Sequence, residues 1–202
     1  MSTPVLIAPN LYQLPALKPA CNCYLITGGK NTLIDVGIRE NYDHLSHQLQ
    51  ELNLSILDIN DIIYTHCHYD HTGAGEFFPH STVYSHPICR EKLLYQDDSC
   101  IYALKYQIAL PTRFPSITID SNDYYNKGIP ALITNSGADG SLIYSIKKLQ
   151  KYNIQLILPG HGKIDYDGNN TLVKTQENII KRIQQKNTTT LKEAEKCQLT
   201  KY

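Results

Sequence analysis

One short stretch after the apolar residues 61–64 limits what this chain can fold into more than any other. It places His66, His68 and His71 around Asp70 within six residues. Imidazole nitrogens and carboxylate oxygens together suit Zn²⁺ and similar divalent cations. The preceding residues are typical of a strand, and a strand that ends in a ligand-bearing loop is a common support for metal chemistry. We therefore predict a metal site at this histidine loop.

Length and charge exclude several classes of protein. The chain has 202 residues and a formal net charge of zero, so a domain with a full hydrophobic core is expected and a basic surface for nucleic acid is not. No apolar run is long enough for a membrane span, and residues 1–4 contain no basic, signal-like start. We expect a soluble, cytoplasmic protein.

The six cysteines include no CxxC pair, so a cysteine zinc ribbon is not expected. Without an export signal, we interpret them as free thiols. Cys21 and Cys23 form a CxC pattern, which is a weak metal or redox signal and is more typical of alternate residues on one strand. We interpret this pair as structural.

Strand and helix patterns intermix along the whole chain. Cys23–Thr27 and Asn31–Val36 are typical of two strands, and the short Gly-rich turn between them indicates a hairpin. Further strands are predicted at residues 5–12, 61–64, 82–85, 117–120, 130–134 and 155–158, and helices at residues 40–53, 88–107, 139–149 and 172–183. The sequence therefore predicts an α/β fold with a mixed sheet.

We predict one domain over residues 1–187. A capping-box pattern that begins at Thr190 predicts a short helix or tail within residues 188–202. His44 and His47 lie in the predicted helix 40–53, and we expect both to face solvent.

The order of the ligands in the histidine loop predicts two adjacent metal positions. Side chains alternate in an extended loop, so His66 and His68 face one side. After a bend, Asp70 and His71 face a second position close by. A histidine-rich surface loop is the alternative, but a second histidine loop at residues 159–162 follows another predicted strand and favours a metal site.

The His-x-His-x-Asp-His pattern of residues 66–71 resembles the signature of the metallo-β-lactamase superfamily. Leu33–Gly37 is similar to the early strand of that family, which ends in Asp-x-Gly, and Leu158–Gly162 is similar to its late Pro-Gly-His-Gly loop. The end of the chain resembles that of the glyoxalase II-like and β-lactamase-like-2 branches. The resemblance extends from about residue 5 to about residue 195.

This resemblance implies an αβ/βα sandwich with two metals at the edge between its sheets. Carried over position by position, it implies that the first metal is bound by His66 and His68 and the second by Asp70, His71 and His161. It also implies that Asp35 steers the histidine loop. The expected cofactor is Zn²⁺, one ion or two, with another divalent metal as an alternative.

The resemblance also implies hydrolysis. Zinc lowers the pKa of its bound water to about 7, so a hydroxide exists at neutral pH and attacks a carbonyl or phosphoryl centre. Asp70 would be the catalytic residue that orients this nucleophile. We predict a metal-dependent hydrolase that acts on a small-molecule ester, thioester or similar substrate.

Two ligands of the family are absent from their expected positions. Ala138 falls where a third histidine for the first metal is expected, and the bridging aspartate of a Gly-Asp pair has no counterpart. Only 22 residues separate Asp139 from His161, so the chain looks internally shortened, with part of the second half of the sandwich missing. Asp139 either substitutes for the bridging carboxylate or caps the helix that follows, and we favour the cap.

Two ligands are too few for a tight first site, so we expect one tight metal or a weakened pair. The missing central strand would expose a sheet edge, which favours a homodimer. Two alternatives to the hydrolase stay open. One is a degenerate member that binds metal without catalysis, and the other is a metal-dependent ribonuclease, against which the lack of basic excess argues.

Overall fold

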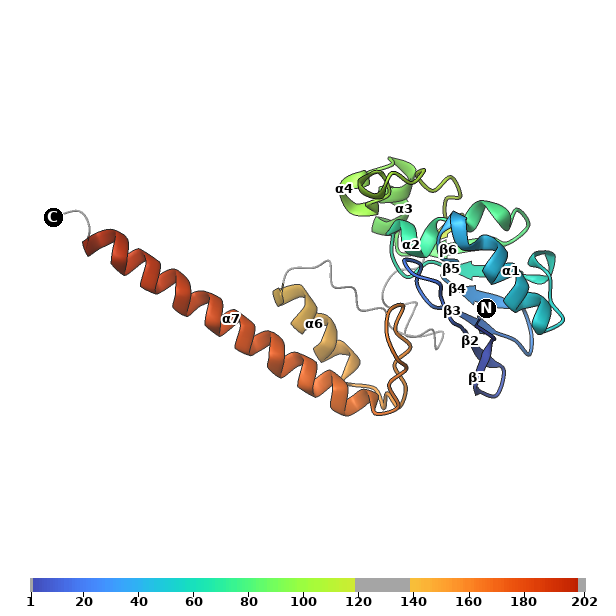
Figure 1. The fold of residues 1–202 in the computed structure, drawn as a ribbon. Helices are drawn as coiled ribbons and strands as arrows, with labels where there is room; N and C mark the ends of the chain where they lie inside the picture. The colour runs from blue at the N-terminus through green and yellow to red at the C-terminus, as the bar shows by residue number, and fades with distance from the viewer. Residues whose placement is uncertain (1, 119–138, 200–202) are drawn as a thin grey trace. The chain divides into compact units, whose positions relative to one another are not determined.

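The computed structural model describes residues 2–118 and 139–199, without the side chains of residues 105, 139–142 and 186–199 (Figure 1). The described residues form two compact units. The first unit comprises residues 2–118 together with residues 160–162, and the second comprises the remaining described residues. The histidine loop and His161 therefore belong to the same unit.

A seven-stranded mixed sheet forms the centre of the first unit, with the strands in the order of the sequence. The strands are β1 Val5–Ala8, β2 Leu11–Leu14, β3 Cys23–Ile26, β4 Thr32–Ile34, β5 Asp61–Ile63, β6 Thr82–Ser85 and β7 Ile117–Thr118. The pairs from β1 to β4 are antiparallel, and the pairs from β4 to β7 are parallel. The prediction of an α/β fold with a mixed sheet is confirmed. One sheet lies within the described residues.

The predicted hairpin is the pair β3 and β4. Leu25 lies opposite Leu33 in the register, and neither side chain is exposed to solvent. Gly28 in the connecting turn has a φ of +93°, a conformation that glycine adopts without the strain a side chain would cause. Burial of this apolar pair, together with the turn, sets the register that leads β4 towards Asp35.

Helix α1, Tyr42–Glu51, connects β4 to the parallel strand β5. The prediction that His44 faces solvent is wrong, because its side chain is buried and its Nε2 lies 3.1 Å from both Ser2 Oγ and the Pro15 carbonyl oxygen. The N-terminal segment covers this face of the helix. His47 is largely exposed, as expected, and its Nδ1 lies 3.3 Å from Glu51 Oε1.

Short helices follow β5 and β6. They are α2 Tyr69–Thr72, α3 Pro87–Leu94 and α4 Asp98–Ile101, and 3₁₀ turns occur at Arg39–Asn41, Ile56–Asp58, Gly75–Phe77 and Leu104–Tyr106. The predicted helix 88–107 is therefore divided into α3, α4 and the 3₁₀ turn Leu104–Tyr106. Gln96, Tyr102 and Gln107 have positive φ angles of 50°, 63° and 59°, which interrupt a right-handed helix.

The second unit contains α6, Asp139–Leu149, and α7, Gly168–Leu199. Ile146 and Leu149 of α6 and Leu172 and Ile179 of α7 are buried. The predicted strand 155–158 is not formed, since only an isolated bridge joins Ile157 to Asp165 there.

Helix α7 is continuous through the residues where a separate terminal helix is predicted. No glycine or proline lies between residues 169 and 199 to end it. The predicted domain boundary at residue 187 falls inside α7 and stays a prediction. The predicted strand 130–134 and Ala138 lie outside the described residues. In the described part of the chain, no helix is long and apolar enough to cross a membrane.

Candidate metal centre

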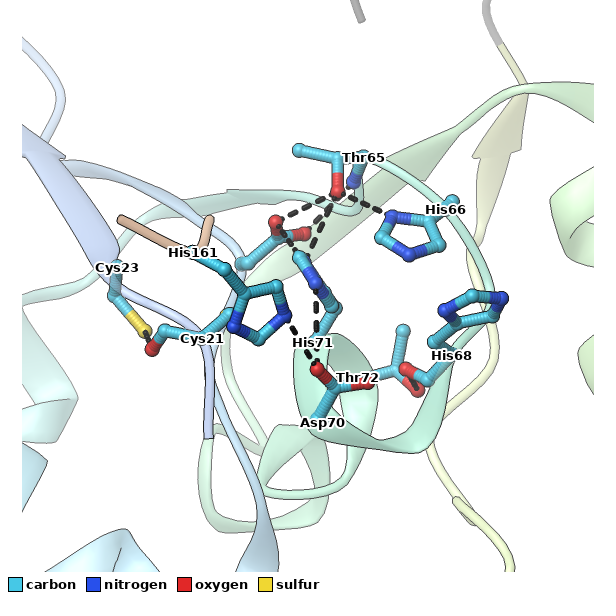
Figure 2. Close-up of polar contacts among 10 residues, drawn as sticks. Cys21, Cys23, Thr65, His66, His68, Asp70, His71, Thr72 and His161 are labelled. Carbon is cyan, nitrogen blue, oxygen red and sulfur yellow. Dashed lines mark hydrogen bonds and ion pairs between the residues drawn. The ribbon is translucent and has the colours of Figure 1, made fainter. Parts of the chain in front are cut away.

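The histidine loop begins where the parallel strand β5 ends. His68 has an extended backbone, with φ −60° and ψ 144°, and is followed at once by the short helix α2. This bend gathers three imidazole rings, as Figure 2 shows. The ring centroid of His66 lies 4.3 Å from that of His68 and 4.0 Å from that of His71.

Asp35, which follows β4, holds this loop through its carboxylate. Its Oδ1 accepts a hydrogen bond from the Thr65 backbone N–H at 2.8 Å, and its Oδ2 accepts one from Thr65 Oγ1 at 2.7 Å. Asp35 Oδ2 also lies 2.7 Å from His71 Nδ1, and both side chains are buried. A carboxylate on Nδ1 fixes the tautomer of the ring and leaves Nε2 available as a ligand. Asp35 thus stands where a residue that steers the histidine loop is expected.

The second predicted metal position is where three side chains converge. His161 Nε2 lies 2.8 Å from Asp70 Oδ2, and His71 Nε2 lies 3.6 Å from the same oxygen. One donor atom from each of these residues lies within 4.8 Å of the other two. Two imidazole nitrogens and a carboxylate oxygen are a donor set that catalytic zinc sites use, with a further position left open. These residues therefore fit a divalent metal.

The first predicted metal position is less complete. Across the described residues, no aspartate, glutamate, cysteine or further histidine joins His66 and His68 to make a comparable group of three donors. Besides His66, the ring of Tyr102 lies near His68, with 5.1 Å between ring centroids. Ala138 lies outside the described residues, and Asp139 begins α6 with a side chain that is also outside them.

The histidines differ in their tendency to carry a proton. Burial, followed by the neighbouring His71 and His68, lowers the pKa of His66 to about 2. Burial also lowers the pKa of His68, although the Asp70 carboxylate opposes this effect. Burial likewise disfavours a charged His71, but Asp35 and Cys21 outweigh it and raise the pKa of His71 to about 11. His66 and His68 are therefore neutral and ready to bind at pH 7, whereas a metal must displace a proton from His71.

Sequence reasoning interpreted Cys21 as a structural strand residue, and the structure places it beside the candidate site. Its thiol is buried within 4.8 Å of donor atoms of Asp35 and His71. The CxC pattern was the only signal in the sequence for this proximity. Cys67, in contrast, directs its sulfur towards the Cys100 carbonyl oxygen at 3.8 Å.

Comparisons with known sequences agree with this geometry. A family model described as the metallo-beta-lactamase superfamily matches residues 18–99, which contain Asp35 and the histidine loop. A probable metallo-hydrolase from Methanocaldococcus jannaschii is 45% identical over 53 residues, which are 26% of this chain and 25% of the relative. This match therefore spans about a quarter of the length of that relative.

Several solved metallo-β-lactamases resemble most of the chain. A motif mutant from Cronobacter sakazakii aligns with a TM-score of 0.74 and 14% identity, over 93% of this chain and 99% of that chain. Native FEZ-1 from Legionella gormanii aligns with a TM-score of 0.73 and 14% identity, over 93% of this chain and 97% of that chain. GOB-18 from Elizabethkingia meningoseptica aligns with a TM-score of 0.71 and 17% identity, over 93% of each chain. At such low sequence identity, these structural similarities establish a shared fold alone.

Proposed function

Since the chain belongs to the metallo-β-lactamase superfamily, we propose that it hydrolyses a small ester, thioester or similar bond with the help of a bound divalent metal. The observation that carries this proposal is the convergence of Asp70, His71 and His161 within 4.8 Å of one another. A carboxylate and two imidazoles from loops 90 residues apart in the sequence meet at one point. A shared ligand explains the meeting.

Asp70, His71 and His161 would hold the metal, which, when bound, lowers the pKa of a water molecule to about 7 and polarises a carbonyl oxygen. Asp35 retains a proton on His71 Nδ1 and so directs Nε2 towards Asp70. The second oxygen of Asp70 would accept a hydrogen bond from the attacking water and orient it. His66 and His68 would bind a second metal more weakly.

The two histidines of this position differ in their exposure to solvent. The side chain of His71 is 5% exposed and that of His161 is 60% exposed, so a substrate would approach along His161. Tyr102, which is 40% exposed and lies edge-on to His68, would offer an aromatic surface to an apolar acyl group. The chain has no overall excess of basic residues to attract RNA, which supports a small substrate over a ribonuclease function.

A metal-binding protein without catalytic activity is the second candidate. The incomplete donor set around His66 and His68 favours it, because two protein ligands bind a metal weakly. Metal analysis and turnover separate the two candidates.

The test begins with the metal content of the purified chain, of a His66→Ala/His161→Ala variant and of a His47→Ala control. His47 is an exposed histidine on α1, so its loss should leave the metal unchanged. We expect about one tightly bound zinc in the wild type and none in the double variant. Equal metal in the wild type and the double variant would contradict the assignment of the site.

Turnover is then measured on ester, thioester, lactam, phosphodiester and RNA substrates, with and without a chelator. Chelator-sensitive hydrolysis of an ester or thioester is expected. Metal binding without turnover of any substrate would favour the second candidate, and cleavage of RNA alone would favour a ribonuclease.

A further inference from the structure

His161 is held in place by something other than packing. Its side chain is 60% exposed, so apolar contacts leave most of the ring free. The residues that flank the loop 160–162 form one isolated bridge and no strand. Nevertheless, His161 Nε2 lies 2.8 Å from Asp70 Oδ2. The backbone around His161 must therefore be fixed by specific hydrogen bonds.

Asn22 supplies these hydrogen bonds on both sides of His161. Its backbone N–H donates to the Gly160 carbonyl oxygen at 2.7 Å, and its side-chain Nδ2 donates to the Gly162 carbonyl oxygen at 3.2 Å. Its Oδ1 accepts a hydrogen bond from the Ala16 backbone N–H at 3.1 Å. The side-chain amide therefore donates to the loop, accepts from the Ala16 backbone and also hydrogen-bonds the Tyr24 side chain.

The preceding residue connects the same segment to the histidine loop. The Cys21 backbone N–H donates to the Asp70 carbonyl oxygen at 3.1 Å. Gly160 also packs closely against Cys21 and His71. A Cβ on Gly160 would lie 3.5 Å from Cys21 Cβ and 2.6 Å from His71 Cε1. Residues 21 and 22 thus contact the loops of Asp70 and His161 at once.

We propose that Asn22 is a positioning residue that holds His161 against Asp70 whether or not a metal is present. The inference rests on the proposed function only where it concerns metal affinity. This role needs a side chain of this length that offers both a hydrogen-bond donor and an acceptor, as an asparagine amide does. An aspartate would keep the acceptor but place a carboxylate oxygen against the Gly162 carbonyl oxygen.

The variant Asn22→Asp removes the donor and retains the size of the side chain. Asn31→Asp is a matched control, because Asn31 Nδ2 also donates to a loop carbonyl oxygen, that of Asp58, at 3.0 Å. Partners that orient a metal ligand typically contribute about 10- to 100-fold to metal affinity. We expect Asn22→Asp to weaken Co²⁺ binding by about tenfold or more and Asn31→Asp to leave it unchanged.

Two readouts on the full chain test the inference. The first is the visible absorption of Co²⁺ during titration of the wild type and both variants. The second is hydrogen exchange of the metal-free protein, in which Asn22→Asp should raise exchange of the backbone N–H of residue 22, which donates to the Gly160 carbonyl oxygen, and Asn31→Asp should not.

The outcomes are separable. If the wild type binds Co²⁺ and Asn22→Asp changes neither affinity nor exchange, the positioning role is overturned and the metal site stands. Faster exchange without any Co²⁺ binding by the wild type would support the positioning role and contradict the proposed function. Unchanged exchange in a wild type that binds no metal would overturn both.

Discussion

The histidine loop and the loop 160–162 contribute ligands to one candidate site, but different interactions fix them. The first loop follows a parallel strand of the core, and its His71 is buried and bonded to Asp35. The second loop presents an exposed His161 on a backbone that two hydrogen bonds from Asn22 hold. One half of the site thus takes its rigidity from the core, and the other takes it from one neighbouring residue. We expect the second loop to loosen first under any perturbation.

The largest effect is expected where the first loop meets the core. Asp35→Asn removes the charge that faces His71 and disturbs both bonds from Thr65. Loss of one partner of a buried pair should destabilise the protein by about 3 kcal/mol in urea unfolding. Glu51→Gln, which breaks the exposed pair with His47, should cost about 0.5 kcal/mol or less. Equal costs for the two variants would refute the claim that the core anchors this loop.

Gly160→Ala should separate the two loops without unfolding either. The added Cβ would lie 2.6 Å from Cε1 of the packed His71 ring, so the loop 160–162 must move away. We expect a loss of zinc affinity of about tenfold in a chelator competition. Gly29→Ala is the control, since its Cβ would meet no atom within 4 Å. Wild-type affinity in Gly160→Ala would show that the second loop does not depend on this close approach.

Removal of the metal should affect the two loops unequally. A metal that binds only the folded state stabilises it, by about 2.7 kcal/mol at a free concentration of 100 times Kd. After chelation, hydrogen exchange should rise by about tenfold at the Asn22 N–H, which donates to the Gly160 carbonyl oxygen, and by less at the Thr65 N–H, which donates to Asp35. Equal increases at the two N–H groups would mean that the two loops are held equally firmly.

The smallest effect is expected from His66→Ala. His66 and His68 have no third donor among the described residues, so the tight metal should not depend on them. The affinity of the tight site should change by about threefold or less, while any weaker second equivalent is lost. A loss as large as that in His161→Ala, measured in the same titration, would place the tight metal at the first position instead.

Local patterns predicted much of the fold and of the first loop. Leu25 and Leu33 alternate with other residues on either side of a Gly-rich turn, and these signals lie within a few residues of each other. The ligand order of the histidine loop is equally local. Such patterns are readable because period and turn chemistry operate over short stretches of chain.

Contacts between distant segments explain what the sequence did not reveal. His44 is buried because residues 2 and 15 cover its helix face, and no pattern in residues 40–53 indicates that cover. Residues 155–158 have strand composition but do not pair beyond one bridge. Asn22 acts on a carbonyl 140 positions away, and a single asparagine before a strand carries no signal for that.

The most direct test of the account is X-ray diffraction from zinc-containing crystals, recorded on both sides of the zinc absorption edge. We predict an anomalous peak among the side chains of Asp70, His71 and His161, with a weaker peak or none beside His66 and His68. A peak at His66 and His68 alone, or no peak at either position in crystals soaked with zinc, would contradict it.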